Sequence, residues 1–146
     1  MTLPRPYRPG IVNLITIVSF VLSGLNVLWL ITVTLLLVFA GALSWLGGPV
    51  IGAIGTLAVG VVVVVLLAQF CLSVLLFMAA LGTMGGRPEG RTRHKRWAWI
   101  IVILDLITLV FTAGLDFAAW FRLGYAIFLI YVLDKPEVRS YFGATA

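Results

Sequence analysis

One acidic side chain, Asp105, lies in the middle of an apolar stretch, eight residues after Trp97 and eight before Ala113. An ionisable group at that depth in a membrane-spanning segment is a candidate functional site. Such a carboxylate can bind a proton or a cation during transport, or it can pair with a polar group on a neighbouring helix. Both roles are open for Asp105 at the level of sequence.

Three further polar residues are expected at or near the same depth and complete the candidate intramembrane set: Asn26, Gln69 and Arg122. In the structural interpretation Asp105 bonds to Arg122, Asn26 or Thr108 as a link between helices. In the transport interpretation Asp105 binds a proton or a cation, and together these residues would form a polar layer at mid-membrane. Asp105 has no Pro or Gly break beside it, which disfavours the discontinuous helices of many transporter sites.

Residues for catalysis or metal binding are few. His94 is the sole histidine and Cys71 the sole cysteine. A transmembrane bis-histidine haem needs two histidines, and a catalytic metal normally takes three protein ligands. The chain has no G-x-S-x-G, H-E-x-x-H or phosphate-binding glycine loop. We therefore predict no enzyme activity, no cofactor and no metal site, with Cys71 as a small buried residue.

The composition is that of an integral membrane protein. Of 146 residues, 62% are hydrophobic and 10% charged, against roughly 45–50% and 25% in soluble domains. The mean hydropathy is +1.18. The net charge of +5 is better explained by basic residues beside membrane spans than by nucleic-acid binding, because anionic headgroups attract such residues.

The apolar runs predict an all-α fold, a four-helix bundle in the membrane made of two hairpins, the first longer than the second. Residues 1–146 form a single transmembrane domain with spans at about 11–46, 50–83, 97–113 and 117–133. Between the hairpins lies a basic loop, 85–96, and a charged tail occupies 134–146. Gly47, Gly48 and Pro49 predict the turn of the first hairpin.

Basic residues set the expected orientation, since positive charge beside a span stays on the cytoplasmic side. We expect both termini to be cytoplasmic. The loop residues expected at the lipid headgroups are Arg87, Arg91, Arg93, Lys95 and Arg96.

The first hairpin contains more apolar helix than a bilayer needs. Its surplus must tilt, bend at Gly24 or Gly41, lie in the headgroups, or be covered by another protein. Small residues let helix backbones approach closely in lipid. The glycines at such spacing form either a packing face within the chain or a docking face for another chain: Gly48, Gly52, Gly55 and Gly60.

The two ends carry a recognisable pattern. Arg5-Pro6-Tyr7-Arg8-Pro9-Gly10 leads directly into a span, and the closing segment from Tyr131 to Phe142 has the form Y-x-L-x-x-P-x-V-[KR]-x-x-F. In this the chain resembles a group of small uncharacterised four-helix bacterial membrane proteins. The resemblance implies the topology and a prokaryotic cytoplasmic membrane, and it implies no activity.

These observations predict a non-catalytic accessory or scaffolding subunit of a larger membrane assembly, for example an energy-converting complex. Its expected partners are membrane lipids and other integral membrane subunits or further copies of itself, with no nucleic acid. The alternative is a small oligomeric transporter or channel that uses Asp105 at mid-membrane. A third interpretation is a lipid-surface or envelope-stress protein that uses the basic loop.

Overall fold

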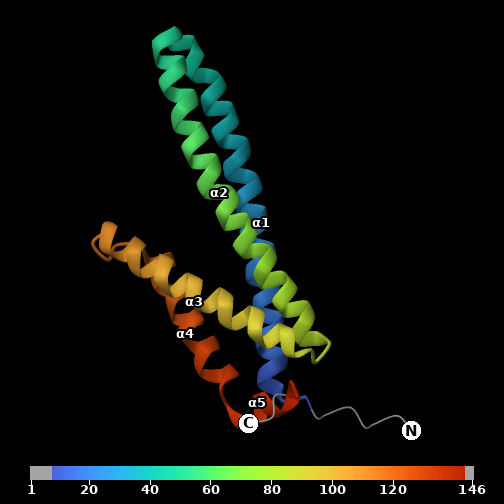
Figure 1. Ribbon diagram of the computed structural model, residues 1–146. Helices are drawn as coiled ribbons and strands as arrows, with labels where there is room; N and C mark the ends of the chain where they lie inside the picture. Colours follow the sequence, from blue (N-terminus) through green and yellow to red (C-terminus); the bar gives the residue numbers. More distant parts are fainter. Residues whose placement is uncertain (1–7, 144–146) are drawn as a thin grey trace. The chain divides into compact units, whose positions relative to one another are not determined.

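The computed structural model describes residues 8–143, and this part of the chain is helical without any strand. The prediction of an all-α fold is therefore confirmed, with two long apolar helices. Predictions that concern residues 1–7 and 144–146 fall outside the described residues. In chain order the elements (Figure 1) are α1 (Gly10–Ser44), the short 3₁₀ helix η1 (Trp45–Gly47), α2 (Pro49–Met84), α3 (Pro88–Phe111), α4 (Phe117–Leu133) and α5 (Pro136–Tyr141).

The described chain divides into two compact units. The single transmembrane domain expected over 1–146 stays a prediction. One unit contains residues 8–20 and 75–143 and is called the terminal unit below. The other, Val21–Val74, is called the hairpin unit. Each unit takes part of α1 and part of α2, because both helices run without interruption across the division.

In the hairpin unit, α1 and α2 lie side by side and are joined by η1 (Figure 1). Gly48 ends the turn with a φ of 99°, a backbone conformation that glycine adopts without steric cost. Near the other end of the unit, Ser23 donates a hydrogen bond of 2.9 Å to the carbonyl of Ser73, whose hydroxyl accepts one from the side chain of Asn26.

Both long helices have the length and apolar composition to cross a membrane, over Gly10–Gly47 and Pro49–Met84. Within their most apolar windows only 6% and 17% of residues are buried, so neither resembles the core helix of a soluble protein. The helix predicted over 117–133 has those bounds in the structure, but with 17 residues it is shorter than these two.

The predicted glycine face is only partly a packing face within the chain. A methyl group added at Gly52 would lie 2.5 Å from the indole of Trp45, and one at Gly55 would meet the Ser44 side chain. These two glycines therefore accommodate the end of α1 and the turn. Gly60, by contrast, has open space around it.

In the terminal unit, α3 and α4 pack against each other through a small apolar core of Leu109, Ala119 and Leu123. A second close approach joins α2 to α3. A methyl group added at Gly90 would lie 2.5 Å from the carbonyl carbon of Gly82, so the two backbones touch there. The glycine pair that packs most closely was thus not among those predicted from the sequence.

The segment 85–96, predicted as a basic loop, is a loop only at its start. α2 ends at Met84, and the φ of 65° at the following Gly86 permits Arg87 N–H to bond back to the Gly82 carbonyl at 3.0 Å. α3 then begins at Pro88, since proline is well suited to the first helical position, and Glu89 lies in the favourable first turn. Residues 88–96 are therefore helical, and so are residues 136–141 of the predicted charged tail.

Candidate functional site

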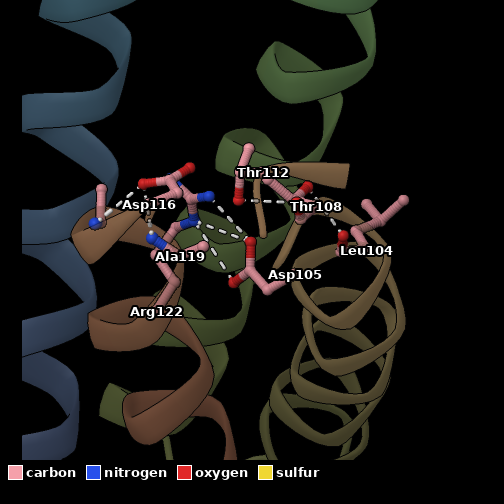
Figure 2. Close-up of polar contacts among 8 residues, drawn as sticks. Leu104, Asp105, Thr108, Thr112, Asp116, Ala119 and Arg122 are labelled. Atoms are coloured by element: carbon pink, nitrogen blue, oxygen red, sulfur yellow. Dashed lines mark hydrogen bonds and ion pairs between the residues drawn. The ribbon is translucent and has the colours of Figure 1, made fainter. Parts of the chain in front are cut away.

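The first polar site is an ion pair between α3 and α4 (Figure 2). Arg122 donates to the Asp105 carboxylate from Nε, at 3.1 Å to Oδ1 and 3.3 Å to Oδ2, and from Nη2, at 2.8 Å to Oδ1. The Asp105 side chain is 4% exposed and that of Arg122 is 46% exposed. The pair is thus a buried carboxylate held by two donor groups of an arginine that also reaches the surface.

A tight turn brings these two residues together from positions 17 apart in the sequence. At the end of α3, Gly114 N–H bonds to the Leu109 carbonyl at 2.7 Å, with Gly114 at a φ of 77°. Asp116 then caps α4 by accepting from Ala118 N–H at 2.9 Å and Ala119 N–H at 3.1 Å (Figure 2).

The other candidate intramembrane residues belong to the hairpin unit. Asn26 bonds to Ser73, and Ser73 in turn donates to the backbone carbonyl of Gln69 at 2.9 Å, while the Gln69 side chain is exposed. Of the three partners considered for Asp105, Arg122 is the one it bonds. Thr108 instead donates to the Leu104 carbonyl of its own helix. A polar layer shared by the two units stays a prediction.

The second polar site is a buried histidine that the sequence had placed in a loop. His94, on α3, is completely buried. Its Nε2 lies 3.0 Å from the hydroxyl of Ser19, which lies 2.9 Å from the hydroxyl of Tyr125. Its Nδ1 lies 3.0 Å from the Gly90 carbonyl and 3.1 Å from the Thr83 hydroxyl. The cluster therefore links α1, α2, α3 and α4 within the terminal unit.

The partners of His94 determine its tautomer. Thr83 uses its single hydroxyl proton to bond the Ala79 carbonyl at 2.8 Å, so towards Nδ1 it can only accept, as can the Gly90 carbonyl. Nδ1 therefore carries the proton and Nε2 accepts from Ser19. Burial lowers the pKa of His94 from 6.5 to about 4, against the opposing effect of the Gly90 hydrogen bond.

A serine that donates to a histidine has the connectivity of a nucleophile and its base. Here both side chains are completely buried, so the arrangement offers a substrate no access. The chemistry that this geometry supports is a fully bonded link between helices.

The sequence holds a signal for this cluster on α1. Polar residues of α1 recur every three or four positions at Thr16, Ser19, Ser23 and Asn26, the spacing of one helix face. The first three are buried and all four have hydrogen-bond partners. Cys71, in contrast, is exposed, which overturns the expectation that it is buried.

The basic residues predicted to lie at the lipid headgroups differ in their ion pairs. Arg91 Nη2 and Lys95 Nζ both bond Asp134 Oδ1, at 2.8 and 2.9 Å, and Arg91 Nε bonds the Leu133 carbonyl at 2.9 Å. The Lys95 hydrogen bond is the main cause that lowers the pKa of Asp134. Arg93 lies 3.5 Å from Glu89. Arg87 and Arg96 are exposed and have no ion-pair partner among residues 8–143.

Within residues 8–143 no three His, Cys, Asp or Glu side chains lie close enough together to hold a metal ion. Comparisons of the chain with models of protein families, with curated proteins and with solved structures find no match.

The ion pair predicts an asymmetry between its two members. Arg122→Gln leaves a buried carboxylate without its counter-charge and should lower the free energy of unfolding by about 3–5 kcal/mol. Asp105→Asn leaves an arginine that already reaches the surface, and should cost about 1 kcal/mol. Denaturant unfolding in an uncharged detergent, followed by circular dichroism, measures both. The double variant should recover most of the Arg122→Gln loss, and equal losses for the two single variants would contradict this account.

The buried histidine predicts a pH dependence of stability between about pH 6.5 and pH 4. In that window the unfolded chain binds a proton at His94 and the folded chain does not, so the free energy of unfolding falls as the pH falls, by up to about 3 kcal/mol. His94→Gln should remove this loss. Asp134 does not interfere, since its lowered pKa affects stability only below its ordinary value of 3.8. Thermal unfolding of both proteins at pH 7 and pH 4.5 is the measurement, and an unchanged slope in the variant would refute the assignment.

Proposed function

We propose that this chain is a four-span integral protein of a bacterial cytoplasmic membrane and acts as a non-catalytic accessory or scaffolding subunit of a larger membrane assembly. The observation that carries the proposal is the apolar surface of the hairpin unit, which continues to the end of both helices. Among its exposed side chains, Leu46 is 84% exposed and Leu57 73%.

The two helices of this surface are longer than the hydrocarbon core of a membrane is thick. α1 has 35 residues and α2 has 36, which at 1.5 Å per residue correspond to about 52 and 54 Å of helix against a hydrocarbon core of about 30 Å. α1 remains helical through Gly24 and Gly41. Apolar helix that extends beyond lipid exposes its side chains to water unless another surface covers it. A partner within the membrane assembly would supply that cover.

The four-span topology rests on charge and length together. α4, with 17 residues, would extend about 26 Å, near the minimum for a span. The residues of α3 that follow its basic start, 97–111, would extend about 23 Å. Arg8, the basic start of α3 and Lys135 would then share the cytoplasmic side, in agreement with the distribution of positive charge in membrane proteins.

The geometry of Asp105 supports scaffolding over transport. Both carboxylate oxygens are already bonded by Arg122, and the side chain is almost completely buried. A proton or cation would have to displace an ion pair, at a cost of several kcal/mol. The His94 cluster is equally closed. These polar groups are therefore better suited to hold helices together than to exchange a solute.

Cysteine labelling tests the topology. In a Cys71→Ser background, Leu46→Cys and Leu115→Cys should react with a membrane-impermeant maleimide in intact spheroplasts, because both positions lie at exposed turns. Thr92→Cys and Glu137→Cys should react only after permeabilisation. External labelling at Thr92 would invert the proposed orientation, and equal labelling of Leu115 and Thr92 from one side would remove the second hairpin from the membrane.

A single glycine tests the scaffolding role. Gly60→Leu fills open space in the hairpin unit, so the chain itself should fold and insert normally, whereas a partner packed closely on this face would be displaced. Co-purification of associated membrane proteins, or self-association measured by sedimentation, should fall while membrane abundance stays the same. Gly124→Leu, also in open space but in the terminal unit, is the matched control. A wild-type chain that is monomeric and isolated in mild detergent would refute the role.

A further inference from the structure

An open groove of about 410 Å³ lies on the surface of the terminal unit, along the first half of α3. It is lined by Arg91, Thr92, Lys95, Arg96, Trp99 and Ile100. One end of the groove is thus cationic and the other is aromatic and apolar. This combination matches a molecule with an anionic head and a hydrocarbon tail.

Two of the positive charges that line the groove are held in place by a shared ion pair, and only one of the three is neutralised. Arg91 and Lys95 share the carboxylate of Asp134, which holds them in place. Arg96 has no ion-pair partner among the described residues. With Asp134 included, the three cations leave a net charge of +2, suited to a phosphate group.

The apolar end continues beyond the groove along the same face of α3. Ile103 follows Trp99 by four residues, and Ile107 follows Ile103 by four, which places them in one row on a helix. Both isoleucines are about half exposed. From Arg96 to Ile107 the helix rises about 16 Å, which is close to the thickness of one leaflet in a hydrocarbon core of about 30 Å.

We infer that this groove is a binding site for an anionic phospholipid. Lys95 Nζ bonds both oxygens of Asp134, so one of its three N–H donors remains. The phosphate of the lipid lies between this donor and Arg96. The Trp99 ring lies at the level of the ester groups, and one acyl chain follows Ile103 and Ile107. The inference rests on the proposed placement of α3 in the membrane, with its basic start at the headgroups. The inference assigns lipid binding to Arg96 but not to Arg93. Arg93 lies on the same helix but outside the groove, and it pairs with Glu89.

Native mass spectrometry of the full chain in an uncharged detergent tests this site. Dioleoylphosphatidylglycerol should bind more tightly than dioleoylphosphatidylcholine, and Arg96→Gln should weaken the binding of the former about tenfold, as expected on loss of a charged hydrogen bond. Arg93→Gln removes the same charge and should change the affinity little. Arg96 is exposed, so unchanged circular dichroism is expected for the variant.

Two results would overturn the inference. Equal losses for Arg93→Gln and Arg96→Gln would indicate diffuse attraction to a basic surface rather than a site. Displacement of the lipid by millimolar inorganic phosphate would indicate a site for free anions, with no part for the acyl chain. A negative result in the lipid experiment would overturn the lipid site alone, because the scaffolding role is tested separately at Gly60. Absence of membrane insertion in the labelling experiment would overturn both proposals.

Discussion

A carboxylate that is 4% exposed must be paired, and this requirement fixes how α3 meets α4. Asp105 can reach Arg122 only if the turn between the helices reverses the chain within a few residues. The positive φ of Gly114 and the cap supplied by Asp116 provide that reversal. Leu109, Ala119 and Leu123 then form a small apolar core between the helices, beside the ion pair in the sequence. Apolar packing alone would leave the rotation of each helix less well defined, because apolar contacts are non-directional.

The two units differ in how their polar groups are used. In the terminal unit, hydroxyl groups, an imidazole and an ion pair connect helices from distant parts of the sequence. In the hairpin unit the polar contacts between α1 and α2 involve Ser23, Asn26 and Ser73. Nearer the turn, the side chains of Val59, Trp45 and Ser44 lie against Gly41, Gly52 and Gly55 respectively. The helices of the terminal unit are therefore connected by several polar contacts between their side chains, whereas the hairpin unit has few such contacts and presents mostly apolar surface.

Much of the helical architecture follows from the sequence, because long charge-free apolar runs are typical of helices with the length and composition to cross a membrane. The bounds of α4 agree with the predicted ones, and Asp105 could be assigned a short set of partners that included Arg122. The helical position of His94 was not predicted, because the density of positive charge indicated a loop, whereas Pro88 and Glu89 favour the start of a helix. Its burial further depends on Gly82 meeting Gly90, a contact between two helices that spacing within either helix does not reveal.

Side chains of the chain itself fill the space beside some of the predicted glycines, which limits where a partner could pack on the hairpin unit. Gly52 lies under Trp45 and Gly55 against Ser44, so a second chain cannot use these positions without moving the turn. Gly48 is required by the backbone of that turn, since its φ is 99°. Gly60 is the one predicted glycine that has both open space and an ordinary helical φ, and it lies among exposed valines and leucines of α2. Close approach of helices in lipid depends on small residues. The partner proposed above would therefore make its closest contact with the hairpin unit at Gly60 and would leave the turn unchanged.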